Sequence, residues 1–464
     1  MSAPATTEKK YLKWYQKLAY GSGDLASNCS YGLVSSFVLL YLTGTLGLDS
    51  AIIGSLMLAS KVLDGISDVI FGTLIDRTHS KLGKARPWML FGQVGVSLCL
   101  FLLFAIPAGS TTMQYIYFFI VYTALNAVFY TANGIAYSSL VALITKNNNE
   151  RVQLGSFRFM FAVVTNIFMG FAVTGMVEKF GSGAAGWRTT ALIFAIVGLV
   201  VNTISCLAVK ELPEKELSDN TSEAAEEGKA VAEEKKHGFA ETAKILVHNK
   251  YYLMILAIYI VYYIMSNLTT GAGVFCATYY WGDGSLLGQF SMMKMFPVII
   301  ALAIAPVLIK KTGSMQKVNF WGYAISSVLG IPMIYFAMQK NLSMFLLFMF
   351  IKGIFAGTLS GSLNALIAEA SGYTTRTTGI HMDGMMYSCS SLGVKVGGGI
   401  GTAAVGWLLK LGGFVGTATV QSESAIRMIF NLYITFPFVI GIIITVLLAF
   451  LDVEKANKKW DAEH

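Results

Sequence analysis

The chain has 464 residues, of which 55% are hydrophobic and 13% charged, and its mean hydropathy is +0.61. Soluble domains carry about 25% charged residues, so this composition excludes a soluble enzyme, a disordered scaffold and a soluble nucleic-acid binder. It predicts an all-α membrane protein. In such a protein the net charge of +8 reflects basic residues that set the orientation in the membrane, and it does not indicate nucleic-acid binding.

Twelve apolar runs separated by polar breaks predict twelve transmembrane helices, since a helix needs about 20 apolar residues to cross a bilayer. In chain order the predicted spans are 21–46, 50–75, 87–107, 113–145, 152–177, 188–209, 251–281, 285–309, 318–339, 342–369, 384–410 and 424–451. One long polar stretch separates six helices from six. The sequence therefore predicts an N-terminal bundle over 1–209, a cytoplasmic linker over 210–250 and a C-terminal bundle with its tail over 251–464. Such repeats are common in secondary transporters.

Basic residues are divided unevenly between the two sets of predicted loops. The set that contains both termini and the linker holds 24 Lys and Arg, whereas the opposite set holds five. The positive-inside rule then places both termini and the linker in the cytoplasm. The basic N-terminus, residues 1–17, lacks the apolar core of a cleavable signal peptide.

The second predicted helix carries two acids inside an apolar run. Asp64 and Asp68 are four residues apart, so their carboxylates lie on one helix face. Two acids this close favour a bound cation or a shared proton, and Ser67 adds a nearby hydroxyl. In the alternative interpretation, both acids only neutralise Lys61 and Lys395.

The loop after this helix, residues 72–88, combines an acid with several basic residues. Asp76, Arg77, Lys84 and Arg86 surround a tight turn. This pattern predicts a latch that holds the cytoplasmic ends of neighbouring helices together, and we expect these residues to take part in gating. Alternatively, the loop only supplies positive-inside charge.

Other charges inside apolar runs predict a substrate cavity, because ionisable groups in a membrane usually face one. Asp24 is too deep for a surface cap, and Arg158 can contact sugar hydroxyls or pair with an Asp. Lys395 lies in a glycine-rich helix, where its depth predicts a carboxylate partner or a snorkelling side chain. The sequence alone assigns no role to Lys61, Lys294 and Lys352.

No reactive constellation is present, since zinc-protease, Walker and nucleophile-elbow motifs are absent and the five histidines are scattered. The five cysteines lie in apolar stretches without paired spacing, which predicts buried packing residues. We therefore expect no enzymatic activity, no cofactor and no metal other than a possible Na⁺ at Asp64 and Asp68.

Four segments together resemble one transporter family. They are Tyr20–Asn28, Leu63–Asp68, Asp76–Trp88 and Tyr387–Lys395 with the glycines that follow. They are similar to the glycoside–pentoside–hexuronide:cation symporters of the major facilitator superfamily, which include the melibiose and glucuronide permeases. The resemblance covers nearly the whole chain and implies two six-helix bundles around a cavity that opens alternately to each side.

The resemblance also implies roles for individual residues. At the substrate it implies Asp24, Asn28, Arg158 and Lys395. At the coupling cation it implies Asp64, Asp68 and Thr131. Lys395 would link the two sites.

Some positions depart from the melibiose permease. Gly134 replaces a sugar-binding Asp, Ser138 and Ser362 replace aromatic residues, and His381 and Asp383 stand where Arg and Glu are usual. The cavity is therefore expected to have lost an acid and aromatic platforms. This favours an anionic, larger or differently shaped substrate over a galactoside.

The expected function is symport of a sugar, glycoside or hexuronide with Na⁺, Li⁺ or H⁺ across a bacterial inner membrane, by a functional monomer. One alternative is a symporter of the same fold for a sulfonated or lipid-like solute. Another is a transporter-like sensor that binds without translocation. Three deep acids against five deep bases predict a preference for an anionic solute such as a uronide.

Overall fold

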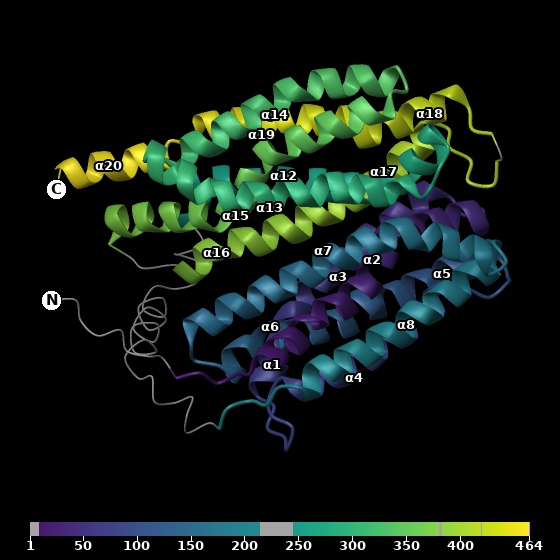
Figure 1. The fold of residues 1–464 in the computed structure, drawn as a ribbon, viewed down its shortest axis with the longest axis horizontal. Coiled ribbons are helices and arrows are strands. Elements are labelled where there is room, and N and C mark those ends of the chain that lie inside the picture. Colours follow the sequence, from purple (N-terminus) through teal and green to yellow (C-terminus); the bar gives the residue numbers. More distant parts are fainter. Residues whose placement is uncertain (1–8, 214–244, 380–382, 419, 464) are drawn as a thin grey trace. The chain divides into compact units, whose positions relative to one another are not determined.

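The computed structural model describes residues 9–213, 245–379, 383–418 and 420–463, and in these ranges every regular element is a helix (Figure 1). The first half contains α1 (Trp14–Gly21), α2 (Gly23–Leu40), α3 (Ser50–Asp76), α4 (Arg86–Leu103), α5 (Thr111–Thr123), α6 (Thr131–Ile144), α7 (Asn148–Lys179) and α8 (Gly183–Leu207). The second half contains α12 (Lys250–Phe275), α13 (Leu286–Thr312), α14 (Met315–Met338), α15 (Leu342–Thr378), α16 (Asp383–Leu392), α17 (Gly398–Leu411), α18 (Glu423–Phe430), α19 (Phe436–Phe450) and α20 (Val453–Glu463).

Five π-helical turns join or extend these helices. They are η1 (Tyr41–Thr45), η2 (Ala124–Tyr130), η3 (Cys276–Trp281), η4 (Gly393–Gly397) and η5 (Asn431–Thr435). The turn η2 joins α5 to α6, η4 joins α16 to α17, and η5 joins α18 to α19. With these junctions counted as continuous helix, each of the twelve predicted spans coincides with one long helical stretch, so the predicted fold class is confirmed.

The largest differences between the predicted and the observed helices occur in three places. The first stretch begins at Trp14 instead of residue 21, and α15 continues to Thr378 instead of 369. The helix α20 was not predicted. All three segments are polar, so hydropathy misses them, yet α20 buries Val453 and Asn457 in the same way as a soluble amphipathic helix does.

The loops supply the caps that begin many of these helices. Asp49, Ser110, Asn147, Asn249 and Ser422 each accept hydrogen bonds from backbone N–H groups in the first turn of the following helix. Such caps satisfy donors that an apolar helix leaves unpaired at its start. Short polar breaks therefore fix the helix starts to within a few residues.

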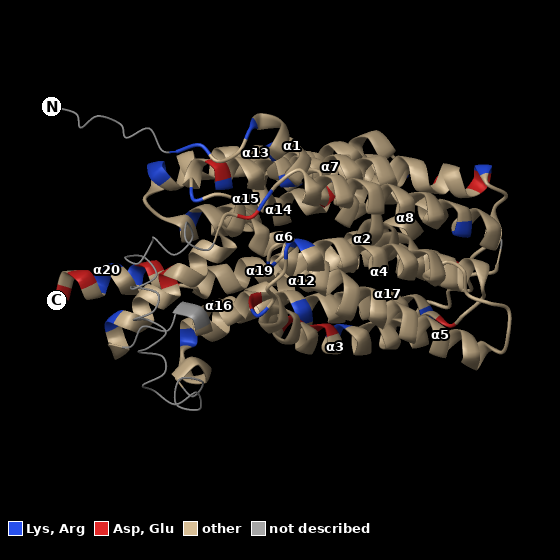
Figure 2. Cartoon of the chain, turned by 90° about the horizontal axis from the view of Figure 1, so that it is seen from below, with Lys and Arg blue, Asp and Glu red and all other residues tan. Residues whose placement is uncertain are grey.

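The chain is a multi-pass membrane protein. Eleven helical stretches in the described ranges are long and apolar enough to cross a membrane. Many charged residues lie near the helix ends, and others lie within helices such as α3 (Figure 2). The helix α3, with Lys61, Asp64 and Asp68, is the long helix outside the set of eleven. All five cysteines are free and buried, as predicted.

The chain separates into two compact units, residues 1–219 with 415–420 and residues 220–414 with 421–464. In the first unit, α2 packs on α7 and α8, α4 on α6 and α8, and α3 on α5 and α6. In the second, α12 packs on α17 and α19, α14 on α15 and α19, and α13 on α15. Each of the pairings named for the first unit has its counterpart in the second, as expected of a structural repeat.

Candidate binding sites in the N-terminal unit

The first site is an ion pair between α2 and α7. The Nε of Arg158 donates to Oδ2 of Asp24 at 2.6 Å. Asp24 lies in the first turn of α2, where the helix dipole favours a negative charge. The side chains of Asp24 and Arg158 are 17% and 25% exposed, so the pair is neither sealed in the core nor at a free surface. The structure thus brings together two of the predicted substrate residues.

Aromatic rings fix the position of this pair. The guanidinium carbon of Arg158 lies 4.2 Å from the centre of the Tyr137 ring, which contacts the ring of Tyr20 at 4.8 Å. The hydroxyl of Tyr137 donates to the Tyr20 carbonyl at 2.8 Å, and the hydroxyl of Tyr20 donates to the Tyr137 carbonyl at 2.5 Å. This reciprocal pairing holds α1 against α6 and leaves the Arg158 face of Tyr137 rigid.

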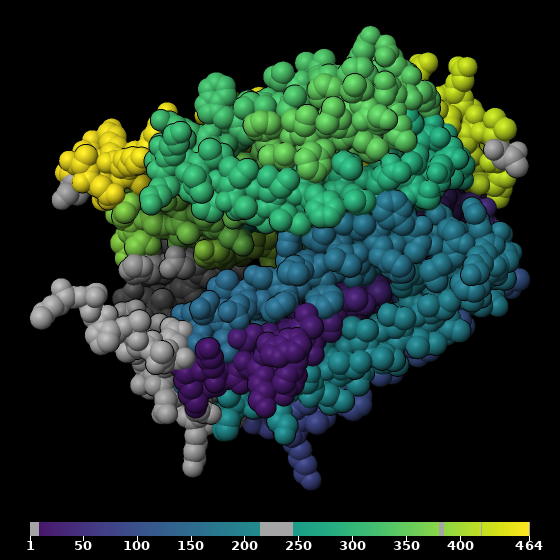
Figure 3. Space-filling view, in the orientation of Figure 1, coloured from purple at the N-terminus to yellow at the C-terminus, as the bar shows by residue number. Residues whose placement is uncertain are grey.

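The break between α1 and α2 allows the close approach that the ion pair needs. A Cβ on Gly21 would lie 2.5 Å from the Cβ of Phe157, and one on Gly23 would lie 2.8 Å from the Tyr137 ring. Glycines are therefore required where the N-terminal helices pass α7 and α6. Figure 3 shows the N-terminal helical residues at the surface of this unit, between α7 and α8.

Asn28 extends the polar surface one turn beyond Asp24. Its Nδ2 donates to the Asp24 carbonyl at 2.7 Å, and its Oδ1 accepts a hydrogen bond from Nδ2 of Asn166 at 2.8 Å. Both amides are partly buried on α2 and α7, the helices that carry Asp24 and Arg158. Asn166 was not identified from the sequence, because only its contact with Asn28 marks it.

The second site surrounds Asp64 on α3. The hydroxyl of Thr131 lies 2.7 Å from Oδ1 of Asp64 and 2.9 Å from the carbonyl of Asn126. On the other side, Nζ of Lys61 lies 3.5 Å from Oδ2 of Asp64. The Asp64 and Lys61 side chains are 12% and 17% exposed. The buried Asp64 carboxylate thus contacts a hydroxyl and an ammonium group, and the same hydroxyl contacts a backbone carbonyl.

The remaining predicted cation residues lie close to Asp64 along α3. The hydroxyl of Ser67 donates to the backbone carbonyl of Asp64 at 2.9 Å, and Asp68 is half-buried one turn further on. Lys61 also faces the Tyr31 ring at 5.8 Å, and this ring stacks on that of Tyr130. The Lys61–Asp64 contact agrees with one part of the alternative interpretation, in which the two acids only neutralise Lys61 and Lys395.

The π turn η2 places Thr131 against α3. It ends at Tyr130, and Thr131 is the first residue of α6. Such turns often occur at functional sites because they displace one residue from the regular helical register. Without the family resemblance, sequence spacing does not connect Thr131 with Asp64, which lies 67 residues earlier.

The loop between α3 and α4 is held by Glu211, which sequence reasoning missed. Its carboxylate accepts from the backbone N–H groups of Lys84, Ala85 and Arg86 at 2.7, 2.9 and 3.0 Å. A carboxylate at a helix N-terminus satisfies unpaired donors and the helix dipole together. Glu211 follows α8, so this contact links the C-terminal end of α8 to the start of α4.

The predicted gating residues have different environments. The guanidinium of Arg86 is buried, with Nε donating to the Cys206 carbonyl at 3.2 Å, so Arg86 ties α4 to α8. Asp76 and Arg77 are exposed at the end of α3. The side chain of Thr78 accepts a hydrogen bond from the Trp88 indole at 2.7 Å, which fixes the turn. The gating role stays a prediction.

We predict that Glu211→Ala lowers the free energy of unfolding by about 1–3 kcal/mol, because three backbone donors lose a charged acceptor. Glu211→Gln should lose less, because an amide oxygen still accepts. Thermal unfolding of the purified chain in detergent measures both, with Glu178→Ala at an exposed helix end as the matched control. A melting temperature for Glu211→Ala equal to that of the control would contradict the inferred contact.

Lys395 lies in the second unit, within the π turn η4. It is partly buried, and the glycines on either side pack on α12. A Cβ on Gly397 would lie 2.4 Å from the Ile260 carbonyl, and one on Gly401 would lie 2.6 Å from the Ile264 carbonyl. The predicted close approach of a neighbouring helix is therefore present. The proposed link between Lys395 and the residues of the first unit stays a prediction.

The positions at which this sequence departs from the melibiose permease lie in different environments. At Gly134 a Cβ would meet nothing within 4 Å, and Ser138 is exposed. Ser362 is buried, and its hydroxyl donates to Oδ1 of Asn319 at 2.9 Å. Ser362 thus packs α15 against α14, and the expected loss of an aromatic platform at this position stays a prediction. His381 and the side chain of Asp383 lie outside the described residues.

Comparison with known proteins gives a consistent match over the whole chain. A family model described as "MFS/sugar transport protein" matches residues 19–455. The isoprimeverose transporter of Lactiplantibacillus pentosus is 26% identical, over 100% of this chain and 94% of that protein. The putative glycoside/cation symporter YagG of Escherichia coli is 24% identical, over 92% of this chain and 90% of that protein.

Two further similarities concern substrate and fold. The putative 2,3-dihydroxypropane-1-sulfonate exporter of Escherichia coli is 26% identical, over 95% of this chain and 92% of that protein. A solved bacterial homologue of the human lysosomal transporter Spinster superimposes with a TM-score of 0.69 at 13% identity, over 96% of this chain and 98% of that one. The latter similarity shows the fold alone.

Proposed function

The chain belongs to the MFS/sugar transport protein family, and from this premise we propose that it couples uptake of a sugar-derived solute to a monovalent cation. Membership confirms the predicted resemblance to the glycoside–pentoside–hexuronide:cation symporters, and a transporter of this family is not an enzyme. The names of the relatives support a sugar or glycoside as substrate and a cation as partner. Alternating access is the mechanism that we propose for the two repeated bundles.

The Asp24–Arg158 pair is the observation that supports a sugar site most directly. Sugar hydroxyls both donate and accept hydrogen bonds, and a carboxylate beside a guanidinium offers both complements. The partial exposure of the pair and the rigid Tyr137 face behind it suit a solute that approaches from one side. Asn28 and Asn166 add amide groups on the same two helices.

Asp64 supports the cation half of the proposal. Na⁺ and Li⁺ are coordinated by oxygen, and the Thr131 hydroxyl lies within hydrogen-bond distance of both the Asp64 carboxylate and the Asn126 carbonyl. The half-buried Asp68 supplies a second carboxylate on the same helix face. A proton can occupy the same carboxylates, so Na⁺, Li⁺ and H⁺ all enter the test.

Counterflow in proteoliposomes tests transport. We expect vesicles loaded with a transported solute to accumulate radiolabelled solute at least about tenfold above vesicles without protein. The panel contains isoprimeverose, a neutral galactoside, its uronide counterpart and 2,3-dihydroxypropane-1-sulfonate, each with a Na⁺, Li⁺ or H⁺ gradient. The sulfonate is included because a relative is named for its export.

The outcomes of this panel separate the proposals. Exchange of a sugar that increases with one cation gradient supports the coupled symporter. Exchange of the sulfonate alone supports the second candidate substrate. Binding of a solute without exchange indicates a sensor and contradicts transport. Equal apparent affinities for a neutral glycoside and its uronide would contradict the expected preference for an anion.

A further inference from the structure

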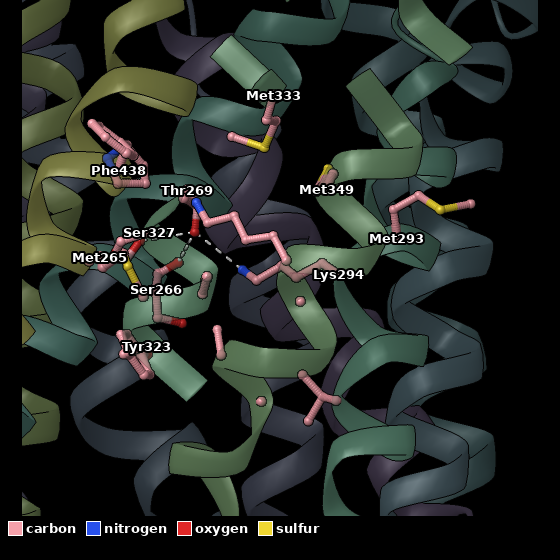
Figure 4. A pocket seen from close by; sticks show the side chains of 18 of the residues that line it. Met265, Ser266, Thr269, Met293, Lys294, Tyr323, Ser327, Met333, Met349 and Phe438 are labelled. Carbon is pink, nitrogen blue, oxygen red and sulfur yellow. Dashed lines mark hydrogen bonds between the residues drawn. The ribbon is translucent and has the colours of Figure 1, made fainter. Parts of the chain in front are cut away.

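The second unit contains two deep lysines to which neither the family nor the transport mechanism assigns a role. Lys294 on α13 and Lys352 on α15 line the same partly open cavity of about 180 Å³, together with residues of α12, α14, α19 and η5. Both side chains are half-buried. Figure 4 shows Lys294 reaching toward Thr269, with Met293, Met333 and Met349 around it.

The hydrogen bonds of the two ammonium groups are incomplete. The Nζ of Lys294 donates to the hydroxyls of Thr269 and Thr270 at 3.3 and 3.2 Å. These hydroxyls in turn donate to backbone carbonyls of α12, so their lone pairs face the lysine. An ammonium group has three donors. One N–H of Lys294 and all three of Lys352 therefore have no acceptor in the ranges that the structure describes.

The helices around the cavity offer no counter-charge at this depth. The sequence has no Asp or Glu between Lys250 and Gly282, between Gly284 and Ala368, or between Asn431 and Phe450. Glu369, the acid of α15, lies 17 residues beyond Lys352, which is about 25 Å along a helix. A buried cation without an opposite charge costs several kcal/mol, so these lysines need a negative partner that the lining helices do not supply.

The rest of the lining indicates the chemistry of such a partner. Hydroxyls of Ser266, Ser326 and Ser327 contribute polar groups, and tyrosine, methionine, phenylalanine and small side chains form much of the remaining wall. The hydroxyls of Tyr262 and Ser360 already bond to each other at 2.7 Å. The cavity therefore has room for a halide ion or for the carboxylate group of a solute.

We propose that this cavity is an anion-binding site, with Lys294 and Lys352 as its cationic ligands and the surrounding serine hydroxyls as further donors. The anion is either a free halide or the carboxylate of a bound solute, since both present one negative charge to the same donors. The site lies within the second unit and is independent of Asp24, Arg158 and Asp64.

Chloride-35 line broadening of the purified full chain in detergent tests the site, because the signal reports weak chloride binding directly. We expect wild type to broaden the signal. In Lys294→Met and Lys352→Met the apparent affinity for chloride should fall at least about tenfold, because each variant removes one cationic ligand.

The control variant Lys311→Met, at the exposed end of α13, should behave like wild type. Methionine matches the length of lysine and is apolar, so the variants should keep the fold. Lys294→Gln and Lys352→Gln provide the same test if either methionine variant aggregates.

Competition separates the two sources of the anion. Sodium galacturonate that displaces chloride, where galactose does not, identifies the carboxylate of a solute. Chloride binding without competition identifies a free halide. The proposal is wrong if the variants broaden chloride as wild type does, or if wild type binds neither chloride nor galacturonate. Because this readout needs no transport, its failure leaves the counterflow result standing, and a failed counterflow leaves the anion site standing.

Discussion

Asp64→Asn should abolish gradient-driven accumulation of the solute while leaving the fold intact. Asparagine keeps an acceptor for the Thr131 hydroxyl, which lies 2.7 Å from Oδ1, but it cannot carry the charge that holds a cation. Loss of a charged partner of this kind costs about 2–5 kcal/mol, so cation affinity should fall at least about 30-fold. Uptake into proteoliposomes with and without the cation gradient measures the change. Accumulation at the wild-type level would overturn the assignment of Asp64 to the cation site.

Graded variants sharpen this result. Thr131→Val removes an uncharged oxygen ligand, a loss of about 0.5–1.5 kcal/mol for the cation, so it should weaken cation dependence only about 2- to 10-fold. Asp283→Asn alters an exposed loop acid and should leave uptake unchanged. These two variants separate a cation ligand from a general effect of lost charge.

The Lys61–Asp64 contact needs its own control, because a structural ion pair would explain the same loss. If Asp64 only neutralises Lys61, removal of both charges in Lys61→Met with Asp64→Asn should restore uptake, since a buried pair is often replaceable as a whole. A cation ligand cannot be restored in this way. We expect the double variant to stay inactive.

The second large effect concerns the substrate. Asp24→Asn and Arg158→Ala should each weaken solute binding at least about 30-fold, the consequence of losing about 2–5 kcal/mol at one charged partner. Cation binding at Asp64 should persist, because Asp24 and Arg158 pair with each other, whereas the Asp64 carboxylate contacts Thr131 and Lys61. Calorimetry with solute and with cation measures both quantities on each purified variant.

Matched controls decide between a solute site and a structural ion pair at Asp24. Arg427→Ala, an exposed arginine of α18, should bind solute normally. If both site variants bind solute like wild type and only their melting temperatures fall, the pair serves the packing of α2 on α7. That result would place the sugar site elsewhere.

Much of the fold follows from the sequence because the bilayer imposes one dominant rule. A helix that crosses it needs a long apolar run, so each of the twelve runs marks a helix, and polar caps such as Asn249 mark where one begins. The rule has no force outside the membrane. For that reason hydropathy missed α20 and placed the start of the first helical stretch too late, after α1. Both helices pack polar segments on the ends of the units.

The candidate sites were predictable only where local spacing or a family motif revealed them. The four-residue spacing of Asp64 and Asp68 identified them as a pair on one helix face, and the family resemblance identified Thr131. Glu211 contacts a loop about 125 residues earlier, and no periodicity encodes such a contact. Asn166 is unremarkable in sequence until Asn28 is seen beside it.

The π turn η2 also affects how this sequence should be compared with its relatives. An α-helix advances about 100° per residue, so one extra residue in a turn rotates everything downstream by about that angle. A helical wheel drawn at constant pitch over residues 111–144 therefore assigns the wrong face to every position after Tyr130. A relative that lacks this residue would align without an obvious error, yet it would present a different side chain to α3 where Thr131 meets Asp64. Single-residue gaps within this helix, which alignments usually treat as noise, therefore mark relatives in which a different residue faces Asp64.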